Sequence, residues 1–217
     1  MARLLLSFRL LPLRLRRVLR HLGRICPWQL FWWNELSFLL MDLLLVVDLY
    51  ELTSNGLAWR TRRLTSHEEA TLRSVYGDAL PYQHIRIDEY ARLGPPQWHF
   101  CYVSFHTINS WGPMSDDILI HEAMHVWQYC HHGAAYIPRA LAAQRTEMGY
   151  NYGGLGNLSE FPELKYYNYE QQADIVADAF RLRCGIRPRW SPRARRNDQA
   201  LFQPFLLEIG MALPNAY

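Results

Sequence analysis

The stretch His121-Glu122-Ala123-Met124-His125 constrains the fold of this chain most. Residues four apart lie on the same face of an α-helix, so His121 and His125 can direct two imidazoles at one metal ion. Glu122 lies one residue further round the helix, where it can reach a metal-bound water as a general base instead of ligating the ion. The spacing therefore predicts a zinc site carried by a helix.

The residues around this motif indicate a buried helix from about Asp116 to His131. Asp116 and Asp117 suit a first helical turn, where acidic side chains complement the helix dipole. Most of the remaining surface of this segment is apolar, which is typical of a helix inside a protein. A histidine pair at this spacing also occurs on surfaces or as hydrogen-bonded core residues. A third ligand is therefore needed to distinguish a metal site from these alternatives.

His131 is one candidate for the third ligand. It gives the spacing H-E-x-x-H-x-x-Q-x-x-H, the metzincin pattern with Gln128 where that pattern has glycine. The glycine allows the helix to turn sharply and bring the third histidine back, which a glutamine cannot do cheaply. We therefore expect the helix to continue past Gln128 and disfavour His131 as a ligand. Glu147, near an expected helix end, is a weaker candidate.

Glu170 is the favoured third ligand. It opens the segment "YEQQADIVADAF", whose apolar residues recur at helical spacing, so a second helix is expected from about Tyr169 to Arg181. Glu170 would complete a His-His-Glu site with a fourth position for water. Asp174, one turn later, would accept the distal N–H of a ligating histidine. The alternative is an ordinary amphipathic helix with solvated acids, to which Asp178 would also belong.

The motifs "HEAMHVWQY" and "YNYEQQADIVADAF" together resemble the gluzincin metallopeptidases. More narrowly, they are similar to bacterial metallopeptidase domains associated with type VI secretion spike and Rhs-type proteins, in which H-E-x-x-H-V-W-Q and E-Q-Q-A recur at a similar separation. The likeness covers roughly residues 64–180 in outline. It implies a zincin-like fold, Zn²⁺ bound by His121, His125 and Glu170, and Glu122 as the catalytic base.

The resemblance also implies a biological setting. An enzyme of this kind would hydrolyse amide bonds in a protein, a peptide or a peptidoglycan peptide, and could serve as a secreted antibacterial effector. Its partners would then include secretion machinery or an immunity protein. The alternatives are a zinc-binding partner module without activity, and a membrane-associated protein that acts through its N-terminus.

The glycine- and tyrosine-rich segment between the two motifs is expected to form a loop at the rim of a cleft. Its tyrosines and the nearby histidines are candidate donors for a tetrahedral oxyanion. The expected donors are Tyr150, Tyr152, Tyr169 and His131. Two aromatic and β-branched segments, residues 83–90 and 98–108, predict strands separated by a turn at 93–97, and an exposed strand edge could pair with an extended substrate.

The N-terminal segment is strongly basic. Residues 1–34 carry seven arginines and no acid, whereas the rest of the chain has a formal charge of −4, with 16 basic and 20 acidic residues. Leucines alternate with the arginines at near-helical spacing, so a basic helix could lie on an anionic membrane surface. We favour the other interpretation, in which the helix packs on the domain with its arginines outward. No aromatic residues interleave with the arginines to stack bases, so no nucleic-acid partner is expected.

The apolar segment Leu36–Tyr50 is expected to be a buried helix, because it is short for a membrane span and contains Asp42 and Asp48. Arg9 interrupts the apolar part of the N-terminus, which argues against a cleavable signal peptide. The four scattered cysteines fit synthesis in the reducing cytoplasm, and export would need another route. Membrane association through residues 1–50 remains open.

Taken together, these features predict a mostly helical α+β protein in two parts. Residues 1–55 would form a basic and apolar helical extension, and residues 56–217 a zincin-like catalytic domain with a short sheet. The Asn55-Gly56 pair suggests a turn at their boundary. Thr65 and Glu68 suggest a capping box. The basic, proline-interrupted stretch 187–196 is expected to be a solvated connector, and residues 201–213 a last packed helix.

Overall fold

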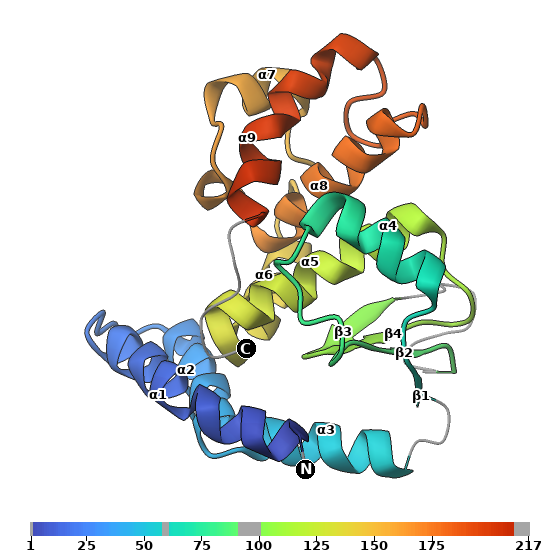
Figure 1. Ribbon diagram of the computed structural model, residues 1–217. Coiled ribbons are helices and arrows are strands. Elements are labelled where there is room, and N and C mark those ends of the chain that lie inside the picture. Colours follow the sequence, from blue (N-terminus) through green and yellow to red (C-terminus); the bar gives the residue numbers. More distant parts are fainter. Residues whose placement is uncertain (1, 58–60, 91–100, 211–217) are drawn as a thin grey trace.

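The computed structural model describes residues 2–57, 61–90 and 101–210, without the side chains of residues 2–4 and 55–57. Its described part is mostly helical with a small mixed sheet, which confirms the α+β class (Figure 1). The turn predicted at 93–97 lies outside the described residues. The helices are α1 (Ala2–Leu22), α2 (Leu30–Leu43), α3 (Val46–Leu57), α4 (Ser66–Tyr76), α5 (Asp116–His132), α6 (Tyr136–Gln144), α7 (Gly154–Glu160), α8 (Tyr169–Arg183) and α9 (Gln199–Ile209).

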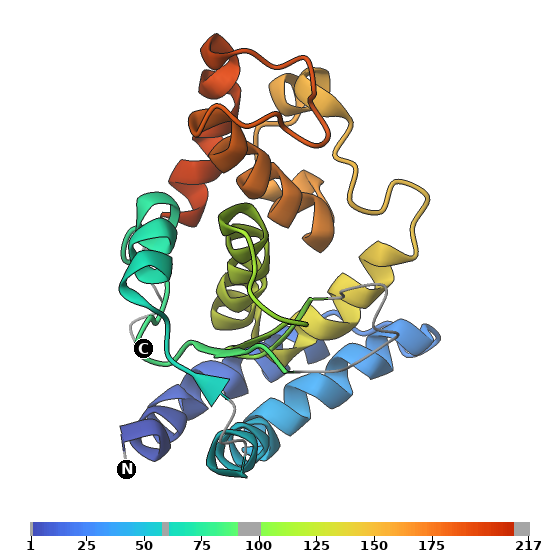
Figure 2. The same ribbon diagram turned by 90° about the vertical axis from the view of Figure 1, so that its right-hand side faces the viewer.

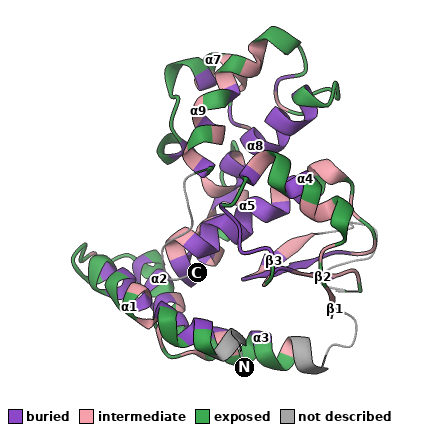
Figure 3. Cartoon of the chain, in the orientation of Figure 1, coloured by how far each residue is buried: buried purple, intermediate pink, exposed green. Residues whose placement is uncertain are grey.

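Helices α5 and α8 form the centre of the molecule. They pack side by side, with α4 and α9 against them, and the burial colours show α5 as almost continuously buried (Figures 1 and 3). Both helices are apolar on several sides, so each loses most of its surface to neighbours. The expected helices at 116–131 and 169–181 are therefore confirmed, and each extends by one or two residues.

The sheet lies beside α5 and has the strand order β1-β2-β4-β3. Its strands are β1 (Thr61–Arg62), β2 (Arg86–Asp88), β3 (Tyr102–Ser104) and β4 (Thr107–Asn109), and only the β2–β4 pair is parallel. Strands β3 and β4 form a tight hairpin in which Phe105 has φ 62°. The Tyr136 hydroxyl accepts from Phe105 N–H at 3.0 Å and donates to the Val103 carbonyl at 2.7 Å. This contact fastens the hairpin to α6.

Helices α1, α2 and α3 form a layer on one side of the molecule (Figures 1 and 2). Two arginines of α1 point inward. Arg14 contacts Asp42 at 3.1 Å and Asp48 at 2.5 Å, and the Arg17 guanidinium donates to the Cys130 carbonyl of α5. The expectation that the arginines of this segment face outward is therefore wrong for these two. Buried acids in α2 and α3 require buried cations, which α1 supplies.

The apolar segment 36–50 is not one buried helix as expected. The chain breaks between α2 and α3, where Leu45 has φ 62°, and Leu40, Leu44 and Leu49 are exposed. Asp42 and Asp48 lie on the inner faces of the two helices, which determines which apolar residues face outward. No helix among the described residues combines the length and apolar character that a membrane crossing requires.

Two local predictions have different outcomes. Thr65 and Glu68 form the expected capping box at the start of α4. The turn predicted at Asn55-Gly56 is wrong, because α3 continues to Leu57. A glycine in the last turn of a helix costs only a modest amount of stability. The helix therefore continues through Asn55 and Gly56.

Candidate metal centre

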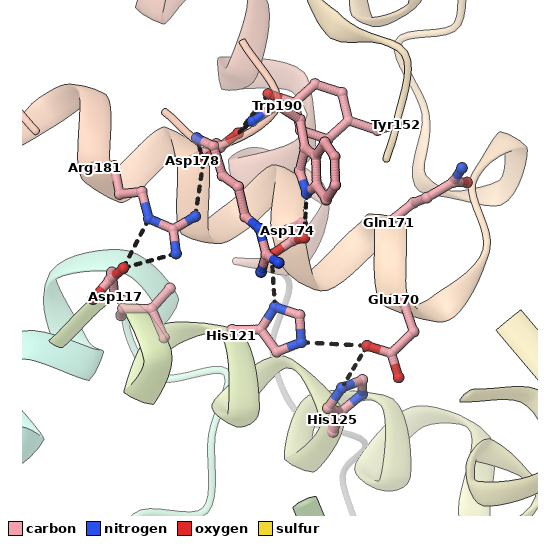
Figure 4. Close-up of polar contacts among 12 residues, drawn as sticks. Asp117, His121, His125, Tyr152, Glu170, Gln171, Asp174, Asp178, Arg181 and Trp190 are labelled. Carbon is pink, nitrogen blue, oxygen red and sulfur yellow. Dashed lines mark hydrogen bonds and ion pairs between the residues drawn. The ribbon is translucent and has the colours of Figure 1, made fainter. Parts of the chain in front are cut away.

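Three side chains from α5 and α8 converge at one point. His121 Nε2 lies 3.3 Å from Glu170 Oε2, and His125 Nε2 lies 3.4 Å from the same oxygen (Figure 4). The three potential ligand atoms all lie within 4.8 Å of one another. His121 is partly buried, and His125 and Glu170 are buried. The structure thus places together the His-His-Glu set that the spacing predicted, and this set could hold a metal ion.

The start of α8 is fixed so that Glu170 stands opposite the two histidines. Asn168 caps the helix by accepting from Gln171 N–H at 2.9 Å, and the Gln171 side chain accepts from Asn168 N–H at 3.0 Å. Gln128 of α5 donates to the Tyr169 carbonyl at 3.0 Å. The two capping bonds use backbone N–H groups that a helix leaves unpaired at its N-terminus. Glu170, the second residue of α8, is therefore held firmly.

Both histidines are oriented by a hydrogen bond at the opposite ring nitrogen. His121 Nδ1 donates to Asp174 Oδ1 at 2.9 Å, and Trp190 Nε1 donates to the other oxygen of Asp174 (Figure 4). His125 Nδ1 donates to Gln128 Oε1 at 2.8 Å. Because Nδ1 keeps its proton for these acceptors, an ion that displaces the Nε2 proton would meet the Nε2 lone pair. The arrangement selects the tautomer that a metal needs.

Glu170 keeps one oxygen for the cluster. Its Oε1 accepts from Gln144 Nε2 at 2.8 Å, while Oε2 faces both imidazoles. Burial would raise the pKa of Glu170, but the charge of His125 and the bonds from both imidazoles hold it well below its usual range. Burial would lower the pKa of His121, yet Asp174 and Glu170 raise it to about 10. The site is therefore a buried ionic cluster whose protons a divalent cation would displace.

Glu122 lies on α5 beside the cluster and is buried. Among the described residues, its Oε2 has no hydrogen-bond partner. Burial raises the pKa of this carboxyl, against the opposing influence of His121 and His125. A buried polar atom without a partner is costly, and such atoms in native proteins are often explained by a catalytic role or a bound water. Glu122 thus presents a buried carboxylate oxygen without a protein partner beside the cluster.

A cavity of about 500 Å³ opens over the cluster. Glu122 and the three convergent residues line its floor, and Tyr150 lines its wall with its ring 5.9 Å from that of His121. The edge strand β3 and helix α6 supply most of the remaining lining, which is largely apolar. These residues are Cys101, Tyr102, Val103, Ser104, Tyr136, Ile137, Ala140, Leu141 and Gln144.

Of the four candidate oxyanion donors, the structure brings only Tyr150 to the cavity. The Tyr152 hydroxyl bonds Asp178 and Ser191, both at 2.8 Å. The Tyr169 hydroxyl accepts from Arg139 at 2.8 Å. His131 stacks on Trp127 and bonds the Trp127 carbonyl. None of these three lines the cavity.

Neither alternative third ligand joins the cluster. Helix α5 continues through Gln128 to His132, so the chain does not turn His131 back toward the histidine pair. Glu147 is exposed in the turn after α6. The geometry therefore favours Glu170 over both.

Three supporting residues were missed from the sequence. In the sequence, Gln128 served only as an argument that the helix does not turn sharply there. Its position three residues after His125 also allows its side-chain amide to reach that ring. Gln144 had no sequence signal. Trp190 lies in the stretch expected to be a solvated connector, and this expectation is wrong there. The backbone N–H groups of Arg189 and Trp190 both donate to Asp178.

Comparison with protein-family models, curated proteins and solved structures finds no match for this chain. The site is consequently defined by its own geometry. It is a His-His-Glu cluster between two buried helices, with an adjacent unpartnered glutamate and an apolar cavity above it.

Proposed function

We propose that this protein is a zinc-dependent peptidase of the gluzincin type. One observation carries the proposal. The Nε2 atoms of His121 and His125 meet one oxygen of Glu170, while Glu122 presents a buried, unpartnered carboxylate oxygen next to them. A fold needs no such arrangement for its stability, because an unpaired buried carboxylate destabilises it.

The residues fit zinc by their chemistry. Two imidazoles and one carboxylate are the ligand set of many catalytic zinc sites, which keep a fourth position for water. Asp174 and Gln128 fix the two rings in the orientation that leaves Nε2 for an ion. Gln144 occupies the second oxygen of Glu170, which leaves one carboxylate oxygen for the ion.

Zinc would supply a Lewis acid that polarises the scissile carbonyl and acidifies the attacking water. Glu122 would remove a proton from that water and deliver it to the leaving amine, a role that suits a carboxylate whose pKa is raised by burial. Tyr150, which lines the cavity, would donate to the oxyanion of the tetrahedral intermediate.

The cavity suggests how a substrate would lie. Strand β3 is at the edge of the sheet, so an extended peptide could add to it through backbone hydrogen bonds. Val103, Ile137 and Leu141 make part of the cavity apolar, which favours a substrate with an apolar side chain next to the scissile bond. Apart from Glu122 and the three convergent residues, its described lining carries no acidic or basic side chain.

The test compares the wild-type protein with Glu122→Gln after reconstitution with zinc. We expect about one zinc per chain in both proteins, and cleavage of a mixed peptide library, followed by mass spectrometry, only in the wild type. The loss should be about 10²–10⁴-fold, the usual contribution of a general base. Zinc binding without cleavage by the wild type would instead favour a partner-binding module. Equal cleavage by both proteins would exclude the role of Glu122.

A further inference from the structure

The outer surface of α1–α3 is unusually apolar. Of the 25 large hydrophobic residues that are exposed among the described residues, 17 lie between Leu5 and Leu52. The loop between α1 and α2 and the first residue of α2 are the extreme case, since Ile25 is 68% exposed, Trp28 87% and Leu30 85%. Such a concentration of exposed apolar side chains is typical of a surface that contacts another molecule or a membrane.

Helix α1 has two apolar faces. Leu6, Leu10 and Val18 are buried against the rest of the protein. A second row at spacings of three, four and seven residues is exposed, and it consists of Leu5, Phe8, Leu15, Leu19 and Leu22. One face is sufficient to pack a helix on its domain. The second row therefore remains for a contact outside the described chain.

Helix α2 repeats this pattern. Trp32, Leu36 and Leu39 face inward, and the opposite side carries exposed apolar residues and no charge. These are Leu30, Trp33, Leu40, Met41 and Leu44. Trp33 and the highly exposed Trp28 are of the residue type that concentrates at the boundary between water and lipid.

The exposed charged residues of this layer are all positive. Arg9, Arg16, Arg20 and Arg24 are exposed. None of the four acids between residues 5 and 54 is exposed, because each is turned toward the protein interior. Asp42 and Asp48 contact Arg14, Glu35 contacts Arg139, and Glu51 contacts His106.

We propose that the outer face of α1–α3 docks on an anionic lipid bilayer, with the helices lying in the plane of the interface. Exposed leucine, phenylalanine and tryptophan beside arginines is the composition of interfacial helices. Lipid phosphates would meet the arginines, and the apolar rows would enter the boundary of the acyl chains.

A second copy of the chain is a poorer occupant of this face. Two-fold pairing would bring the same surface of both copies together. The exposed arginines of both copies would then lie in one interface. The described residues 5–54 offer no exposed acid there to neutralise them. Anionic lipid supplies the missing negative charge, so charge complementarity selects the bilayer.

Sedimentation with vesicles tests the proposal on the full chain. We expect the wild type to bind vesicles of phosphatidylcholine with phosphatidylglycerol, and to bind phosphatidylcholine alone much more weakly. Trp28→Ser with Leu30→Ser should weaken binding about tenfold or more, since two large apolar side chains no longer leave water. Arg9→Gln, Arg16→Gln and Arg20→Gln should each weaken binding roughly fivefold.

The matched control is Ile186→Ser with Leu207→Ser, two exposed apolar residues outside α1–α3. This variant should bind like the wild type. Absence of wild-type binding to anionic vesicles, or an equal loss in the control, would overturn the proposal. A wild-type dimer in solution that becomes monomeric with the Trp28→Ser pair, with no vesicle binding, would assign the face to self-association instead. All these variants should retain zinc, so this test is independent of the peptidase proposal.

Discussion

Asp174 Oδ1 lies 2.9 Å from His121 Nδ1, and this contact joins α8 to α5 at the candidate metal centre. Asp174 is itself held by the indole N–H of Trp190. Asp174 is only 1% exposed, so its carboxylate has few alternative partners and little freedom to move. The orientation of the histidine ring therefore depends on residues that would not touch the ion.

Replacing Asp174 with alanine should weaken zinc binding about 10–100-fold, because His121 loses the partner that fixes its ring and its proton. Competition with a chromogenic chelator measures this change. Asp116→Ala is the control, since Asp116 lies on the same helix as His121 and its carboxylate bonds the exposed His67, away from the cluster. An unchanged affinity in Asp174→Ala would show that the ring is held by packing alone.

Glu170→Ala should lose most of the bound zinc, whereas His131→Ala should keep about one zinc per chain. The first variant removes a residue of the cluster, and the second removes a ring that stacks on Trp127 away from it. Metal analysis of the purified, reconstituted proteins decides whether Glu170 or His131 is the third ligand. The reverse result would favour the metzincin arrangement.

Tyr150→Phe should lower kcat about 10²–10³-fold with a small change in KM, because an oxyanion donor acts mainly in the transition state. Tyr152→Phe is the matched control. Its hydroxyl bonds Asp178 and Ser191 in the core, so its loss should cost about 1 kcal/mol of stability and leave kcat nearly unchanged. A large kcat effect in Tyr152→Phe alone would reassign the donor.

The buried pair of His106 and Glu51 should make stability depend on pH. Burial opposes the charge on His106, but Glu51 outweighs it and raises the pKa from 6.5 to about 9. Since the folded pKa exceeds the unfolded value, this contribution is complete below pH 6.5 and is lost as the pH rises through about 9.

Glu51→Gln should therefore reduce the difference in unfolding free energy between about pH 6 and about pH 10 by on the order of 2 kcal/mol. Urea unfolding at the two pH values measures it. His67→Asn, which removes an exposed histidine, should leave the difference unchanged. A pH profile that is the same in Glu51→Gln and the wild type would contradict the assignment.

The candidate metal ligands were predictable because their placement depends on local periodicity. A helix places His121 and His125 on one face whatever surrounds it, and the acids at Glu170 and Asp174 follow the same rule on a second helix. The pairing of those two helices was an inference from the need for a third ligand and from the resemblance. The structure brings the two helices together through Gln128, which bonds the start of α8.

Features that depend on the path of the chain could not be predicted in this way. Arg14 and Arg17 look like ordinary polar residues of an amphipathic helix, and only the folded chain brings Asp42 and Asp48 to them. A usable signal was present, because two acids inside an apolar segment require buried cations. Trp190 gave no comparable signal, since its partner Asp174 belongs to another element.

The bond from Arg17 to the Cys130 carbonyl has a mechanical consequence. The same helix, α5, carries His121 nine residues earlier, a distance of about 13 Å along a helix that rises 1.5 Å per residue. A bilayer that binds α1 would therefore hold the cavity over His121 at a fixed distance from the membrane, because α5 connects the two. Such a protein would cleave only bonds that lie at that distance from the lipid surface and carry suitable side chains.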